Sequence, residues 1–179
     1  MPSAVAGDQG AQLLALYDHS VGEVFGYLLN RCRNRTTAED ITSDVFLGAV
    51  DAVSRGTPVE VTTAWLIGIA RHKLVDHWRR VEREQRRLQA VADEVRVDPE
   101  GDRNDPWGLH LDVLAARDAL ERLGAHHRSA LTLRYLDGLP VGEVAAVLGR
   151  TIHATEALLV RARRAFRYVY ETGEERTSE

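Results

Sequence analysis

Residues 140–164, PVGEVAAVLGRTIHATEALLVRARR, carry the pattern that decides the fold of the C-terminal half of the chain. Pro140 suits the start of a short helix over residues 141–148, and Gly149 suits the left-handed position that ends it. Thr151 can cap a second, longer helix that reaches to about residue 169. Two helices joined by a tight glycine turn, the second rich in arginine, are typical of a helix-turn-helix.

A helix-turn-helix inserts the start of its second helix into the major groove of DNA, where side chains meet the edges of bases. The pattern leaves open a second interpretation, an ordinary helical hairpin whose arginines are solvated. If the motif does bind DNA, the residues at the start of the second helix face the bases. They are Thr151, Ile152, His153, Thr155 and Glu156.

Upstream of this motif the sequence predicts another helix over residues 129–136, ended by Asp137 and Gly138. Residues 93–112 hold two prolines, two glycines and little apolar content, which is typical of a flexible linker. We therefore expect a C-terminal helical domain over residues 113–170, preceded by an acidic linker over residues 89–112. Residues 171–179 form an acidic tail.

The N-terminal half has helical periodicity in three segments and no sustained alternation that would predict strands. Residues 11–33 and 38–53 predict two helices, the second with Thr37 as its N-cap. Gly56 and Pro58 predict a loop, and a third helix runs from about residue 62 past residue 80. Residues 1–12 are expected to be disordered and residues 13–88 to form the first domain. The predicted fold class is all-α, with two small helical domains.

Charge is distributed unevenly along the chain, although the net charge is only −4. Basic residues gather in residues 71–88 and 161–167, while acidic residues dominate the segment between them. Two separated basic segments can bind a polyanion at two points, but the acidic balance predicts weak DNA binding by the protein alone.

The remaining composition indicates a cytoplasmic protein without membrane insertion. No run approaches the roughly 18 consecutive apolar residues of a membrane-spanning helix. The first twelve residues contain no basic side chain, unlike the start of a secretory signal. The single cysteine, Cys32, cannot form an internal disulfide and is expected to be a small buried hydrophobe.

Several motifs in both halves resemble RNA polymerase sigma factors of the extracytoplasmic-function (ECF) type. ALERL at residues 119–123, LTLRY at 131–135, EVA at 143–145, LG at 148–149 and RAR at 161–163 resemble sigma region 4. AEDI at 38–41 and DVFL at 44–47 resemble the polymerase-docking helix of region 2. AWLIGIAR at 64–71 and WRR at 78–80 resemble its promoter-melting helix. The two halves occur in the family's order, with a linker too short for the extra domain of larger sigma factors.

One departure from the family lies in the recognition helix. HATEAL at residues 153–158 stands where Gly-Thr-Val-Lys-Ser-Arg is frequent, so two cations are lost. The resemblance therefore implies a different promoter preference, or contacts shifted to Arg161 and Arg164.

The resemblance implies partners and contact residues. The partners are promoter DNA, the β′ clamp helices and β flap of the RNA polymerase core, and an anti-sigma factor; no cofactor or metal is implied. The loop over residues 54–63 resembles the family's specificity loop, which captures a flipped base of the −10 element. Contacts to the polymerase core would come from Glu39, Asp40, Asp44, Phe46 and Asp51. The −10 element would contact Arg71, His72, Lys73, Asp76, Trp78, Arg79 and Arg80. The −35 element would contact Arg150, Thr151, His153, Thr155, Glu156, Arg161 and Arg164.

Two other function classes compete with this interpretation. A helix-turn-helix regulator that binds duplex DNA without polymerase would explain the C-terminal half, and a palindromic operator would favour it. A helix-bundle metalloenzyme could draw ligands from His72, Asp76 and His77, but no second ligand helix accompanies them and the neighbouring arginines repel a cation. With neither a phosphate-binding loop nor a nucleophile elbow in the sequence, we expect no catalysis by this chain.

Overall fold

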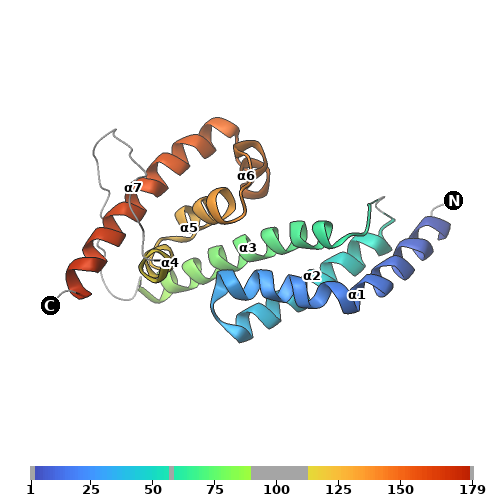
Figure 1. Cartoon of the computed structure of the whole chain (residues 1–179). Coiled ribbons are helices and arrows are strands. Elements are labelled where there is room, and N and C mark those ends of the chain that lie inside the picture. The colour runs from blue at the N-terminus through green and yellow to red at the C-terminus, as the bar shows by residue number, and fades with distance from the viewer. Residues whose placement is uncertain (1–2, 57–58, 90–112, 178–179) are drawn as a thin grey trace. The chain divides into compact units, whose positions relative to one another are not determined.

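The computed structural model describes residues 3–56, 59–89 and 113–177 and is helical in these segments, with no strand among them (Figure 1). Side chains are described for residues 9–56, 59–88 and 113–173. Most of the linker expected over residues 89–112 lies outside the described residues. Among the described residues, no helix combines the length and apolar character that a membrane-spanning segment requires. The all-α fold class is thus confirmed for the described chain.

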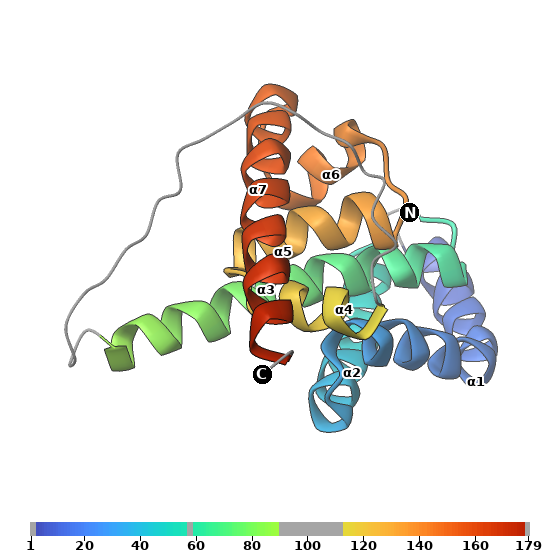
Figure 2. The same ribbon diagram turned by 60° about the vertical axis from the view of Figure 1, so that its left-hand side comes forward.

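The chain divides into two compact units, residues 1–77 and residues 78–179. The first unit consists of α1 (Ser3–Cys32), α2 (Arg35–Ser54) and the N-terminal half of α3 (Thr63–Gln89). Figures 1 and 2 both show these three helices side by side. The helix α1 begins at Ser3, and Gln9 is buried, so the expectation of disorder is wrong for residues 3–12, the described part of the segment 1–12.

The core of the first unit is built from one apolar stripe on each helix. On α2 the buried positions recur at helical spacing, which is the pattern of an amphipathic helix with one inward face. Side chains from all three helices are at most 3% exposed, and they are small or aliphatic, which suits close helix packing. These residues are Val24, Leu28, Ala38, Ile41, Val45, Ala49, Leu66, Ala70, Leu74 and Val75.

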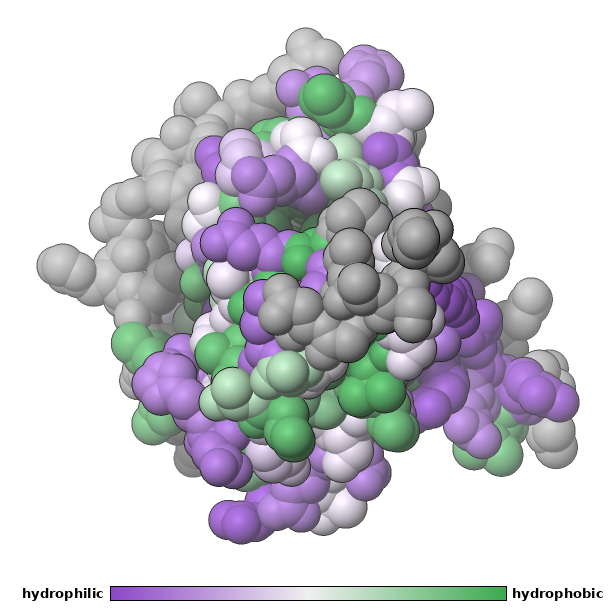
Figure 3. Space-filling model, turned by 90° about the vertical axis from the view of Figure 1, so that its right-hand side faces the viewer, coloured by the Kyte–Doolittle hydropathy of each residue, from purple (hydrophilic) through white to green (hydrophobic). Residues whose placement is uncertain are grey.

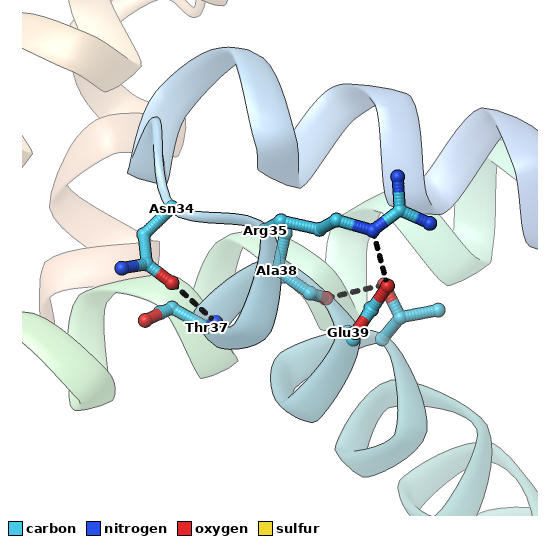
Figure 4. Close-up of polar contacts among 6 residues, drawn as sticks. Asn34, Arg35, Thr37, Ala38 and Glu39 are labelled. Atoms are coloured by element: carbon cyan, nitrogen blue, oxygen red, sulfur yellow. Dashed lines mark hydrogen bonds and ion pairs between the residues drawn. The ribbon is translucent and has the colours of Figure 1, made fainter.

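The start of α2 is capped by Asn34 rather than by Thr37, the residue that the sequence suggested. Asn34 has an extended backbone conformation, and its Oδ1 accepts a hydrogen bond of 2.9 Å from the backbone N–H of Thr37 (Figure 4). In the first turn of α2, Arg35 forms an ion pair of 2.8 Å with Glu39, which lies one turn further along the helix. The helix therefore starts three residues earlier than expected, because a side-chain acceptor is available at residue 34.

The second unit contains the C-terminal half of α3 together with α4 (Val113–Glu121), α5 (Ala125–Leu131), the π-helical turn η1 (Thr132–Leu136), α6 (Val141–Leu148) and α7 (Ile152–Thr177). The long helix α7 packs against α4, α5 and α6. Leu123, Leu131 and Ala162 form the centre of a buried cluster that α7 extends with Phe166 and Val169. This helix runs well past the end expected near residue 169.

The π-helical turn η1 ends the helix that the sequence predicted over residues 129–136. It closes with a hydrogen bond from the backbone N–H of Asp137 to the carbonyl of Thr132, one residue longer than an α-helical bond. Leu133 is buried, whereas Leu136 is 55% exposed and lies outside the core. Gly138 follows with a positive φ of 69°, which lets the chain turn into α6.

The predicted helix-turn-helix geometry is present in α6 and α7. The first helix has the bounds that the sequence suggested, and Gly149 ends it in the left-handed conformation, with φ 63° and ψ 43°. Thr151 Oγ1 accepts a hydrogen bond of 3.2 Å from the N–H of Ala154, so Thr151 caps α7. Local capping chemistry thus fixes both sides of the turn.

We expect Asn34→Ala to lower the free energy of unfolding of the first unit by about 1 kcal/mol, because the Thr37 N–H loses its acceptor. Urea unfolding of the full chain, followed with a spectroscopic probe in the first unit, measures this change. Asn30→Ala is the matched control: Asn30 is exposed in the last turn of α1, where its Nδ2 donates to the carbonyl of Gly26 and caps no helix N-terminus. A loss for Asn30→Ala equal to that for Asn34→Ala would contradict the capping role.

Candidate functional site

The outward face of α2 is acidic. Glu39, Asp40, Asp44 and Asp51, four of the polymerase contacts that the resemblance implies, are all exposed. Two of them are partly neutralised within the helix, since Glu39 pairs with Arg35 and Asp51 pairs with Arg55 across 2.6 Å. Among the described residues no ion pair engages Asp40 or Asp44, so these two carboxylates dominate the potential of the face.

Phe46 does not belong to this acidic face. It is 9% exposed, and its ring meets that of Tyr17 edge to face with centroids 4.8 Å apart. Its ring packs against Tyr17, which is 45% exposed, and both residues line the apolar groove described below, so the contact predicted for Phe46 stays a prediction and belongs to that groove.

An apolar groove of about 840 Å³ lies between α1 and α2, beside the acidic face. Leu14, Leu47 and Val50 line it and are 78%, 67% and 53% exposed. Apolar side chains exposed among polar ones are visible on the face shown in Figure 3. None of these three residues is among the contacts predicted from the sequence, although Leu47 falls on the same side of α2 as Asp40 and Asp44. An exposed apolar patch rimmed by charge is the usual character of a protein-binding surface.

The predicted DNA contacts on α3 differ in their accessibility within the first unit. His72 and Asp76 are exposed, while Arg71 and Lys73 are half-buried. The stem of Lys73 lies over α2, where a Cβ added at Gly48 would stand 3.6 Å from Lys73 Cε. A Cβ at Gly48 would therefore make an ordinary van der Waals contact with the lysine stem, which shows that the stem lies along α2.

The remaining residues of this set belong to the second unit. Arg80 is exposed, and Arg79 donates a hydrogen bond of 2.9 Å to the carbonyl of Leu148, at the end of α6. Trp78 is 7% exposed, with the guanidinium of Arg128 at 4.5 Å from its ring centroid. The structure therefore does not offer Trp78 as a stacking face for DNA, because its ring is covered.

The start of α7 presents most of the predicted base contacts to solvent. Arg150, Thr151, Ile152, His153 and Glu156 are exposed, and the imidazole of His153 is 98% accessible. Arg161 is also exposed, and Arg164 is half-buried.

Thr155 does not face solvent, so the prediction that it contacts a base is wrong. It is fully buried, and its hydroxyl donates a hydrogen bond of 2.9 Å to the carbonyl of Thr151. A threonine that bonds to the preceding turn from inside the core cannot reach a base edge.

Two adjacent histidines near the start of α5 have lowered pKa values. Burial lowers the pKa of His126, and the positive charges of Arg150, Arg79 and Arg86 lower it further, against the opposing effect of Glu82. Burial also lowers the pKa of His127, aided by the charges of Arg161 and His126. The folded second unit therefore favours the neutral imidazoles.

Comparison with known proteins matches both parts of the chain. Residues 16–84 match the family description "Sigma-70 region 2" and residues 114–166 match "Sigma-70, region 4". The sequence is 34% identical to the ECF RNA polymerase sigma factor BldN of Streptomyces coelicolor, over 82% of this chain and 56% of that protein. It is 33% identical to the ECF RNA polymerase sigma factor SigC of Mycobacterium tuberculosis, over 72% of this chain and 68% of that protein.

The chain belongs to the ECF sigma factor family.

A solved structure supports the fold of this ECF sigma factor. The sigma factor RpoE of Bartonella quintana, crystallised with the anti-sigma factor NepR, superimposes with a TM-score of 0.56 at 19% identity, over 89% of this chain and 97% of that chain. The chain spans little more than half the length of BldN. In the described parts of this sigma factor, His, Cys, Asp and Glu side chains form no group of three or more that could hold a metal ion.

We expect the free energy of unfolding of the second unit to fall as the pH drops through about 6.5, the ordinary pKa of histidine. Since the pKa values of His126 and His127 are lowered in the folded state, the unfolded chain binds more protons just below that pH, which favours unfolding. Urea unfolding between pH 5 and pH 8 measures the dependence.

The double variant His126→Gln, His127→Gln should flatten this dependence. His153→Gln, at an exposed position in the same unit, is the matched control. An unchanged pH dependence in the double variant would show that other groups cause it.

Proposed function

We propose that this protein is a sigma factor that binds the bacterial RNA polymerase core, directs it to specific promoters and initiates transcription there. The observation that carries the proposal is the presence of both sigma regions in order, each with surfaces suited to its role. These surfaces are an acidic and apolar face on α2, cations along α3, and an exposed helix-turn-helix start on α7. The catalytic chemistry belongs to the polymerase, and the sigma factor acts with it in the cytoplasm.

The polymerase-docking surface comprises the acidic face of α2 and the adjoining groove. Asp40 and Asp44 supply negative charge, while Leu47 and Val50 supply apolar area directly beside them. The β′ clamp helices are the proposed occupant of this surface, with basic side chains for the carboxylates and apolar side chains for the groove. Charge steers such an encounter and fixes its register, and burial of the apolar patch slows dissociation.

The −10 element is proposed to contact α3 and the loop before it. Arg71, Lys73 and Arg80 can hold phosphates of the separated strand, and His72 and Asp76 are exposed for bases or sugars. Arg79 joins them when its guanidinium releases the carbonyl of Leu148 and donates its hydrogen bond to a phosphate oxygen instead. This exchange replaces a neutral acceptor by an anionic one, which makes the hydrogen bond stronger.

The −35 element is proposed to contact the start of α7. His153 and Glu156 stand where they can read base edges, Arg150 and Thr151 flank them, and Arg161 and Arg164 reach phosphates further along the helix. Region 4 would also bind the β flap of the polymerase. Two modest DNA contacts joined by one chain raise the effective concentration of each at a promoter that carries both elements.

An anti-sigma factor is proposed to control the protein. The acidic face and apolar groove of the first unit would be covered in that complex, because a surface shaped for the polymerase also suits a competitor of the same chemistry.

Transcription in vitro tests the proposed function. Purified core polymerase, with and without this protein, is supplied with genomic fragments from the source organism. Defined transcripts that require the protein are the expected result. If the protein neither binds core polymerase nor supports initiation, yet binds duplex DNA specifically by itself, it is a helix-turn-helix regulator instead.

We expect Asp44→Lys to weaken binding to core polymerase roughly tenfold, because it reverses an unneutralised charge in the docking surface. Fluorescence titration at two salt concentrations measures the affinity, and the loss should shrink at high salt. Glu23→Lys, at an exposed position on α1, is the control with the same charge change. Equal losses for both variants would place docking elsewhere.

We expect His153→Ala to weaken discrimination between the −35 element and its single-base variants roughly fivefold, equivalent to about 1 kcal/mol. Thr155→Val should leave this discrimination intact, because the Thr155 side chain is buried, and should change only the stability of the second unit. Transcription from matched promoter variants measures both. A change of base preference in Thr155→Val would overturn the assignment of its side chain to the core.

A further inference from the structure

The loop before α3 and the first residue of α3 are each tied to α1 by a hydrogen bond from a polar side chain. Gln9 Nε2 donates to the carbonyl of Val59 across 2.8 Å, and the hydroxyls of Ser20 and Thr63 lie 2.8 Å apart. Gln9 is 6% exposed and Ser20 is fully buried. These two contacts, called the loop brace below, join residues 50 and 43 positions apart in the sequence.

Local hydrogen bonds fix both ends of the same loop. After α2, Gly56 adopts a positive φ of 70° and its N–H bonds to the carbonyl of Val53. Before α3, Thr62 Oγ1 accepts a hydrogen bond of 3.2 Å from the N–H of Trp65. The turn after α2 and the first turn of α3 are therefore set locally, and the brace is what holds Val59 and Thr63 against α1.

The burial of Gln9 is costly. Its Nε2 is satisfied by Val59, but its Oε1 is buried without a hydrogen-bond partner in the described structure. A buried polar atom left unpaired costs about 1–3 kcal/mol, and such a position in a folded protein calls for an explanation. An apolar residue would fill this place on α1 without that cost, but it could not donate to the Val59 carbonyl.

We propose that Gln9 and Ser20 are positioning residues for −10 element recognition, which act by holding residues 59–63 in the conformation that reads DNA. Gln9 lies before the segment that matches sigma region 2, so the first turns of α1 extend the promoter-recognition unit beyond that segment. The inference rests on the proposed function, in which this loop meets the −10 element. A loop held in its bound conformation avoids the entropy cost of ordering when DNA arrives.

The main test is Gln9→Glu, which keeps the size of the side chain but removes the donor and sets a carboxylate against the Val59 carbonyl. Initiation with core polymerase is compared between a promoter and its single-base −10 and −35 variants. We expect discrimination at the −10 element to fall about fivefold, the equivalent of one net hydrogen bond, with −35 discrimination and core affinity unchanged. Gln12→Glu, on the exposed side of the same helix, is the matched control and should retain −10 discrimination.

Two further measurements keep the test decisive. Ser20→Ala removes the other half of the brace without adding charge, and should also lower −10 discrimination. Hydrogen exchange at residues 59–63 should become faster in both variants, and this readout does not depend on transcription. Unchanged −10 discrimination in both variants, or an equal loss at the −10 and −35 elements, would overturn the proposal. Absence of initiation by the wild-type protein would instead refute the proposed function, while the exchange data would still test the brace.

Discussion

The rotation of α2 about its own axis is the constraint on which the first unit depends. Ile41, Val45 and Ala49 must face inward, because leaving these apolar side chains in water would forfeit the main favourable free energy of folding. Once they are buried, Asp40, Asp44 and Leu47 can lie only on the outward side. The same rotation brings Phe46 against Tyr17, and it places Gly48 under Lys73 of α3. Packing thus decides which side chains remain to meet a partner.

The second unit follows the same logic with α7 as its central helix. Leu158, Leu159 and Ala162 are buried against the neighbouring helices and set its rotation. That rotation turns Thr155 inward and leaves His153 and Glu156 exposed, although all three lie within one turn of the helix. Only a narrow strip of side chains along α7 is therefore exposed to DNA, because the others are buried in the core.

Polar side chains at the boundaries of the packed units do two different things: some cap helix ends, and others hold a distant backbone segment in place. Asn34 and Thr151 cap helices from exposed positions, where local geometry is sufficient. Gln9 and Arg79 instead act over long sequence separations, one on the loop before α3 and the other on the end of α6. Such contacts cost desolvation and side-chain entropy, so they mark places where the position of a backbone segment matters.

The sequence by itself determined the helical class, the turn between α6 and α7 and the acidic face of α2, because these depend on residues close together in the chain. Periodicity, a capping side chain and a left-handed glycine act within a few residues, and Gly149 shows that they suffice. The sequence did not show that Phe46, Trp78 and Thr155 are buried. It also did not show that Asn34, and not Thr37, caps α2, or that Gln9 bonds to Val59 in a distant loop. Only the tertiary structure decided these, since a residue at the edge of an apolar stripe is buried or exposed according to neighbours far away in the sequence.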